Sequence, residues 1–218
     1  MGPATLQTRM APVQNRDGFP VVVMSQQVMA GSDQTYHAYG PAWANVSNTP
    51  FRKYKHWVHE GGISTPLIAH WPDRIKDHGQ IRRQPGHLID VMATLVEIAG
   101  ANYPQEFNGH RIQPLEGKSL INVFTMNKVV EREAIYFEHE GNRAIRQGKW
   151  KLVSKAYPKT GKFRKMDEIP QDQWALYDME KDRTETSDLA DQYPEKVKKM
   201  ARKWVQWAER TNTIPKPE

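Results

Sequence analysis

Four short stretches of alternating apolar and polar residues constrain the fold of this 218-residue chain more than any other feature. They lie at residues 134–137, 144–146, 150–153 and 174–177, and Gln147-Gly148 stands between the second and the third. Short strands joined by turns of this kind pair with their neighbours, so the pattern predicts an antiparallel meander. A final amphipathic helix is predicted from Pro194, with apolar residues at 197, 200, 201, 204, 205 and 208 on one face.

The preceding residues predict a different organisation. Residues 1–50 form an irregular lead-in, because prolines and glycines interrupt every period and only residues 19–24 are strand-like. Pro66–Trp71 has the apolar run of a short buried strand, and residues 86–99 have the apolar spacing of a helix that Gly100 would end. We therefore expect two units, at residues 1–128 and 129–218.

The composition excludes several classes of site. The chain has no cysteine, so disulfides, thiolate metal sites and cysteine nucleophiles are impossible. Its 31 basic and 25 acidic residues leave a mild net charge of +6. No stretch approaches the roughly 20 apolar residues of a membrane span, and the N-terminal residues lack the apolar core of a secretion signal. We expect no membrane partner.

Residues 51–62 form the most unusual window of the sequence. Several cations, His56, His59 and Glu60 precede a Gly-Gly pair whose backbone could approach a ligand closely. The alternative interpretation is a basic surface segment. A metal site on His56-x-x-His59-Glu60 is disfavoured, because the spacing matches neither H-E-x-x-H nor H-x-x-E-H. We assign no metal ligand in this chain.

Two further segments carry charge in the predicted sheet. Residues 138–143 include His139 beside two carboxylates at a turn between strands, where an imidazole could take part in acid–base chemistry. A plain solvated turn explains the same residues. Residues 151–165 hold six basic side chains and no acidic one, which could contact phosphates. Without a nucleic-acid motif, we interpret this cluster as a solvated hairpin tip and expect no nucleic-acid partner.

Long ordered matches to a known family run from about residue 35 to the C-terminus. The central match includes Tyr54-Lys-His-Trp-Val-His-Glu-Gly-Gly-Ile-Ser-Thr-Pro66 within residues 43–72. Further matches lie at residues 86–94, 115–120, 142–153, 176–185 and 188–190. These stretches closely resemble the formylglycine-dependent sulfatases of the arylsulfatase type.

The resemblance implies a fold, an activity and site residues. The expected fold is of the α/β class: the C-terminal portion of an alkaline-phosphatase-like α/β domain, then a small antiparallel sheet with a C-terminal helix. The implied activity is hydrolysis of aryl or carbohydrate sulfate esters. The family's sulfate-binding lysine lies five residues before the Glu-Gly-Gly glutamate, which is the position of Lys55. The family places this sheet beside the active-site mouth, so His139 and Arg143 become candidate substrate-binding residues.

Two departures from the family pattern limit this expectation. No serine begins the C/S-x-P-x-R motif that yields formylglycine, and the Asp-Asp and Asp-Asn-Gly motifs of the calcium site are absent. We therefore expect a C-terminal fragment that lacks the N-terminal half of the same protein, the nucleophile and the calcium ligands, and that is inactive alone. The parent protein would be periplasmic or secreted. The alternative is a noncatalytic module that binds sulfated glycans through Arg52, Lys53, Lys55 and residues 151–165.

Overall fold

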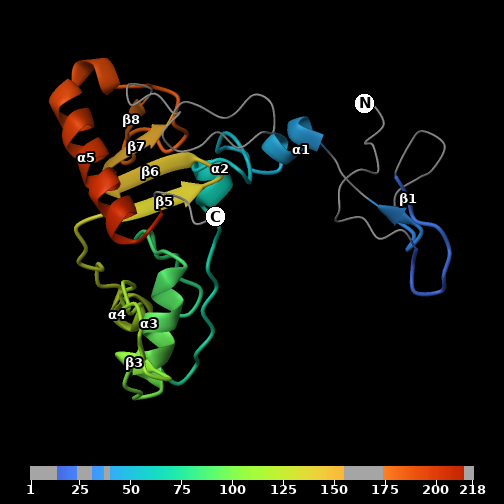
Figure 1. Ribbon diagram of the computed structural model, residues 1–218, viewed down its shortest axis with the longest axis horizontal. Helices are drawn as coiled ribbons and strands as arrows, with labels where there is room; N and C mark the ends of the chain where they lie inside the picture. The colour runs from blue at the N-terminus through green and yellow to red at the C-terminus, as the bar shows by residue number, and fades with distance from the viewer. Residues whose placement is uncertain (1–13, 24–30, 37–39, 155–173, 214–218) are drawn as a thin grey trace.

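A computed structural model describes residues 14–23, 31–36, 40–154 and 174–213 (Figure 1). Its centre is a four-stranded sheet, and a smaller helical region lies beside it. The elements in chain order are β1 (Val22–Val23), β2 (Thr35–Tyr36), α1 (Gly40–Val46), α2 (Glu60–Ile63), α3 (Ile89–Ile98), β3 (Glu106–Phe107), β4 (His110–Arg111), α4 (Ile121–Met126), β5 (Ile135–His139), β6 (Asn142–Gln147), β7 (Trp150–Ser154), β8 (Trp174–Asp178), the 3-10 helix η2 (Ala190–Gln192) and α5 (Pro194–Arg210).

The predicted meander is confirmed. Strands β5, β6, β7 and β8 pair in chain order, and every pair is antiparallel. Gly148 makes the β6–β7 turn with a φ of +57°, in the left-handed region that favours glycine. The register places Ile145 opposite Leu152 and Leu152 opposite Leu176, so one apolar row crosses three strands.

Helix α5 covers one face of the sheet (Figure 1). Pro194 begins the helix, as expected from its fixed φ, and Arg210 lies in the last turn, where a cation favours the helix dipole. The helix buries Met200, Trp204 and Ala208 against the apolar row of β6, β7 and β8. This interface is the main hydrophobic core of the chain.

The opposite face of the sheet is also covered, by residues 52–63. Alternation along the strands turns Ala144, Val153 and Ala175 away from α5, and Val58 packs against them. The sheet is therefore buried on both faces, and the segment that contains the predicted catalytic lysine forms one of the two covering layers.

Helix α3 ends where the sequence predicts, but the face that it buries is its polar face and not its apolar stripe. Its C-terminus has a Schellman motif, with Gly100 at φ +59° and the Ala101 N–H bonded to the Val96 carbonyl at 3.0 Å. The side chains that it buries are Asp90 and Thr94. The apolar residues lie outward, and the exposed ones are Leu88, Ile89, Val91, Met92, Leu95 and Ile98.

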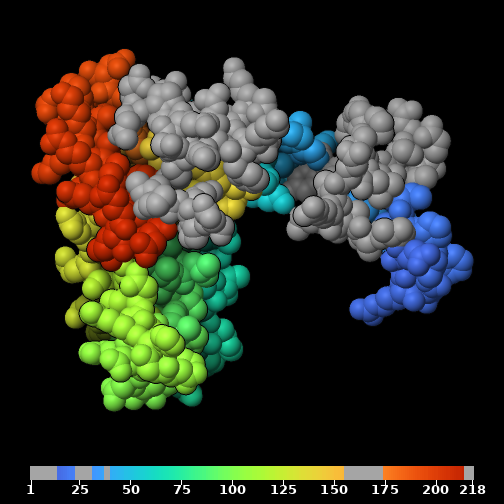
Figure 2. Space-filling view, in the orientation of Figure 1, coloured from blue at the N-terminus to red at the C-terminus, as the bar shows by residue number. Residues whose placement is uncertain are grey.

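Buried polar bonds explain this orientation. The Asp90 carboxylate accepts hydrogen bonds from the backbone N–H groups of His87 and Lys118, both at 2.8 Å, and pairs with Arg132 at 2.7 Å. The Leu120 N–H donates to the Thr94 hydroxyl at 2.9 Å. These bonds hold the chain after residue 116 against the polar side of the helix. Figure 2 shows the resulting lobe, in green, projecting below the sheet.

Three predictions about elements were wrong. Pro66–Trp71 is neither a strand nor buried: Ile68 is 90% exposed, because the chain there runs along the outside of α3. The lead-in contains the short helix α1, which the proline count obscured. Lys151 does not belong to a solvated hairpin tip, because it lies in β7 and is fully buried; residues 155–165 of that cluster lie outside the described residues. None of the described helices is long and apolar enough to cross a membrane.

The core predicts unequal responses along α5. Trp204 is fully buried, and its indole N–H donates to the Phe137 carbonyl at 3.0 Å. Trp204→Ala should therefore lower the free energy of unfolding by about 3–5 kcal/mol, measured by urea denaturation. Gln206→Ala, on the exposed side of the same helix, should stay within about 0.5 kcal/mol. Similar losses at both positions would contradict this register of the helix.

Candidate functional site

Lys55 lies in a tight turn on the second face of the sheet. The Trp57 N–H donates to the Tyr54 carbonyl at 3.1 Å and closes the turn, and the Lys55 side chain is exposed. Lys53 and His56 have φ values of +72° and +86°. These left-handed residues on either side of Lys55 prevent residues 53–56 from forming a regular extended strand. The turn presents Lys55 to the outside.

The Gly-Gly pair supports this turn by accepting close backbone contacts. A Cβ atom on Gly61 would lie 2.4 Å from the carbonyl oxygens of Arg52 and Lys53, and one on Gly62 would lie 2.0 Å from the Trp57 carbonyl oxygen. Such distances exclude any side chain at either position. The glycines therefore let the chain fold back on itself, whereas the sequence had suggested close approach of a ligand.

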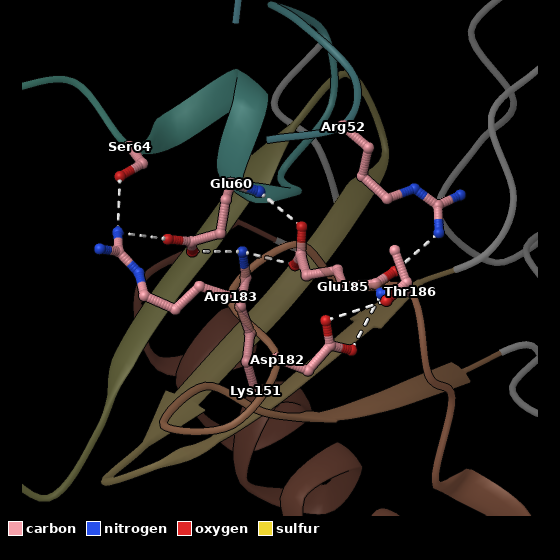
Figure 3. A network of polar contacts seen from close by, with 8 residues as sticks. All are labelled: Arg52, Glu60, Ser64, Lys151, Asp182, Arg183, Glu185 and Thr186. Atoms are coloured by element: carbon pink, nitrogen blue, oxygen red, sulfur yellow. Dashed lines mark hydrogen bonds and ion pairs between the residues drawn. The ribbon is translucent and has the colours of Figure 1, made fainter. Parts of the chain in front are cut away.

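A buried network of charges holds the end of this segment against the sheet (Figure 3). The Lys151 ammonium lies 2.8 Å from a Glu60 carboxylate oxygen and 2.9 Å from a Glu185 carboxylate oxygen. The second Glu185 oxygen accepts the Glu60 backbone N–H at 2.7 Å. Arg183 also pairs with Glu60, at 3.3 Å, and donates to the Ser64 hydroxyl. Three segments of the chain therefore meet at one lysine.

The two carboxyl groups of the network have opposite pKa shifts. Burial opposes ionisation of Glu60, but Lys151 and Arg183 outweigh it, so the pKa of Glu60 lies below its ordinary value. Burial dominates at Glu185 and raises its pKa in spite of Lys151. Glu60 is therefore the more firmly ionised partner of Lys151.

Further cations surround the Lys55 turn. Arg52 donates to the Glu185 carbonyl at 2.7 Å, and the Lys53 ammonium lies 4.2 Å from the centre of the Trp57 ring. Burial and the charge of Arg52 lower the pKa of Lys53. His59 is buried, and its burial together with the nearby cations lowers its pKa to about 3. His59 is thus a neutral packing residue at physiological pH, and the segment has a positive electrostatic environment.

His139 lies beside the Lys55 turn, and its role as a substrate-binding residue stays a prediction. The imidazole rings of His139 and His56 are stacked, with their centroids 6.1 Å apart. Glu140 joins the two histidines: its carboxylate lies 2.5 Å from His56 Nδ1 and 3.8 Å from His139 Nε2. The fully buried Asn142 donates to the His56 carbonyl at 2.6 Å and attaches the turn to β6.

Arg143 is not brought together with Lys55. It follows Asn142 on β6, so its side chain points to the opposite face of the sheet. Arg143 is buried. Its guanidinium lies 4.9 Å from the centre of the Trp174 ring and 5.4 Å from the centre of the Trp204 ring. Burial lowers the pKa of Arg143. Its assignment to a substrate pocket stays a prediction, and its surroundings are those of a packing residue.

Sequence reasoning missed the residues that position the site. Lys151 was counted with a basic loop, although strand alternation places it on the same face as Val153, which is buried. Glu185 carried no signal, because its partners are more than 30 residues away in sequence. The contact between His56 and Glu140 spans 84 residues and was not foreseen either.

Comparisons with known proteins identify the family of the chain. The family described as N-sulphoglucosamine sulphohydrolase, C-terminal, matches residues 51–210, well over half of the chain. An uncharacterized sulfatase of Schizosaccharomyces pombe is 29% identical over 191 residues, covering 86% of this chain and 32% of that protein. An arylsulfatase of Klebsiella aerogenes is 36% identical over 91 residues, covering 41% of this chain and 19% of that protein. The chain spans at most about a third of these relatives' lengths.

A solved structure supports the same fold. The crystal structure of Ps i-CgsB superposes with a TM-score of 0.57 and 25% sequence identity, over 74% of this chain and 32% of that chain. The mixed helical and antiparallel architecture with its C-terminal helix is thus the expected α/β one. The chain therefore belongs to the N-sulphoglucosamine sulphohydrolase C-terminal family, the C-terminal region of alkaline-phosphatase-like sulfatases.

Proposed function

We propose that this chain is the C-terminal part of a sulfate-ester hydrolase and that Lys55 binds the sulfate group. The observation that carries the proposal is the Lys55 turn itself: an exposed ammonium on a backbone fixed by Gly61-Gly62 and by the Lys151 network. In sulfate-ester hydrolysis, negative charge moves onto the leaving oxygen as the sulfur–oxygen bond breaks. A positioned ammonium stabilises that charge in the transition state.

The charges around Lys55 support this role. Arg52 and Lys53 add positive potential near the turn, which favours an anionic substrate. The side chains of Arg52 and Lys53 are engaged with the Glu185 carbonyl and the Trp57 ring, respectively. Lys55 is thus the cation of this segment that is turned outward.

The nucleophile and the calcium ion belong to another part of the proposed enzyme. The 218 residues contain no cysteine and no serine in the formylglycine motif. Calcium binds six to eight oxygen ligands, whereas the one convergent group of potential ligands in the described residues offers two imidazoles and a single carboxylate. This group does not fit calcium, so the proposed role of the described residues is to supply Lys55 and part of the substrate pocket.

The substrate class of the parent enzyme is an aryl or carbohydrate sulfate ester. Relatives include the Klebsiella arylsulfatase and an ulvan-active sulfatase of Formosa agariphila that is 31% identical over 101 residues. His139, 56% exposed and next to His56, is the proposed wall of the pocket in this chain. A sulfate esterase of this kind would act in the periplasm or outside the cell.

The alternative hypothesis, a noncatalytic module that binds sulfated glycans, is weakened by the burial of one of the residues that it requires. It required Lys151 as part of an exposed basic cluster, but Lys151 is fully buried and paired with Glu60. Of the residues that it named, Lys55 is the one that projects from the described surface. The hydrolase proposal explains the same lysine and the family membership together.

The first prediction concerns the isolated chain. Residues 1–218 should not hydrolyse a chromogenic aryl sulfate, with or without added calcium, because they supply no nucleophile. The measurement is product absorbance after repeated purification. Activity that stays proportional to the concentration of the chain through every purification step would contradict the proposal.

A second prediction concerns Lys55 in a longer protein that joins this chain to the nucleophile segment. Lys55→Ala should lower kcat by about 10²–10³, the scale of losing one transition-state donor. Lys55→Arg should rescue poorly, because a planar guanidinium cannot replace a compact ammonium. Lys53→Ala is the matched control and should change kcat little. An unchanged kcat for a well-folded Lys55→Ala variant would refute the assignment.

A third prediction tests the network that positions the turn. Lys151→Ala leaves Glu60 and Glu185 buried without their shared cation, so stability should fall by about 3–5 kcal/mol. Lys198→Ala removes an exposed pair with Glu195 and should change stability little.

The pH dependence of this loss has a definite sign. Without Lys151, the buried carboxyl groups take up protons more readily in the folded state than in the unfolded one. The Lys151→Ala variant therefore gains stability as the pH falls. In the unsubstituted chain, Glu60 has a lowered pKa, so its contribution to the free energy of unfolding is lost as the pH falls. Urea unfolding should show the deficit of Lys151→Ala shrinking between pH 7 and the ordinary carboxyl range near 4.5. A deficit independent of pH would exclude this mechanism.

A further inference from the structure

We propose that His56, His139 and Glu140 form a binding site for one divalent transition-metal ion, for which zinc is the experimental probe. One ring nitrogen from each histidine and one carboxylate oxygen lie within 4.8 Å of one another. The sequence analysis disfavoured a metal site on His56, His59 and Glu60 and assigned no metal ligand in this chain. The structure separates those residues, because Glu60 pairs with Lys151 and His59 packs near Tyr177.

The donor types select the class of metal. Two imidazole nitrogens with one carboxylate oxygen are a typical three-residue ligand set for zinc, which leaves a fourth position open. Hard cations such as calcium and magnesium require mainly oxygen ligands, which this cluster does not offer. A transition-metal ion bound here would therefore be distinct from the calcium of the proposed enzyme.

The backbone around the cluster holds the three side chains in place. The two segments that carry them are joined by the hydrogen bond from Asn142, whose side chain is fully buried, to the His56 carbonyl. In the β5–β6 turn, the Gly141 N–H donates to the Glu138 carboxylate at 2.8 Å. A backbone fixed in this way lowers the conformational entropy that the chain loses when an ion binds.

The cluster is also open enough for an ion to enter. The side chains of His56, His139 and Glu140 are 35%, 56% and 23% exposed, respectively. Within the described residues, Glu140 pairs with the two imidazoles and with no lysine or arginine. A metal ion would replace the His56–Glu140 contact with three coordination bonds and would link the Lys55 turn to the end of β5.

The test uses the full chain, stripped of metal with a chelator and titrated with zinc against a chromogenic competitor near pH 7.5. We expect saturation at one ion per chain and no competition from calcium. His139→Ala and Glu140→Gln should each weaken zinc binding at least about tenfold, since even the loss of outer hydrogen-bond partners costs that much. His110→Ala is the control, because His110 is exposed on β4 and does not belong to the cluster.

Cobalt provides a second readout of the same site. Visible absorption bands of Co²⁺ should appear with the unsubstituted 218-residue chain and with the His110→Ala variant. They should be lost with the His139→Ala variant. Because His139 is largely exposed, its replacement should leave the circular dichroism spectrum unchanged, which separates ligand loss from unfolding. The proposal is overturned if the parent chain binds no zinc, or if His139→Ala and His110→Ala bind it equally. Neither outcome bears on the sulfatase proposal, because zinc binding is measured without turnover.

Discussion

The ion pairs of Lys151 are the interaction on which the arrangement of this chain depends. A fully buried ammonium is costly unless its charge is matched, and its partners, Glu60 and Glu185, come from α2 and from the loop after β8. The cost of separating them forces residues 52–63 onto the sheet. Gly61-Gly62 then admits the backbone of Arg52 and Lys53, which brings the Lys55 turn close to α2.

The two faces of the sheet pack against different parts of the chain. One face packs against α5 through large apolar side chains such as Trp204, and Arg143 lies among them. The other face carries small residues such as Ala144 and Ala175, which leave room for the folded-back segment around Val58. Alternation along each strand thus assigns a residue to the α5 face or to the face that packs against residues 52–63. This assignment explains why His139 and Arg143, four residues apart, have different surroundings.

The sequence allowed the local elements to be predicted and left their surroundings undetermined. The meander, α5 and the Gly100 cap follow from periodicity and turn residues, which act over a few positions. Lys151 was misplaced because a count of charges along the chain ignores the strand that removes one of them from water. The pairing of His56 with Glu140 depends on contacts across 84 residues, for which a single sequence has no signal.

Helix α3 also shows that a local pattern does not determine which surface of an element is buried. An apolar stripe predicts which residues share a face, but not which face is covered within a given chain. Here Asp90 and Thr94 bind the backbone at Lys118 and Leu120, and these directed bonds turn the apolar face outward. Contiguous exposed apolar surface typically marks a contact face. An outward apolar face is thus consistent with a chain that spans at most about a third of its relatives' lengths. In this region, as at Lys151, buried polar groups determine where the apolar surfaces lie.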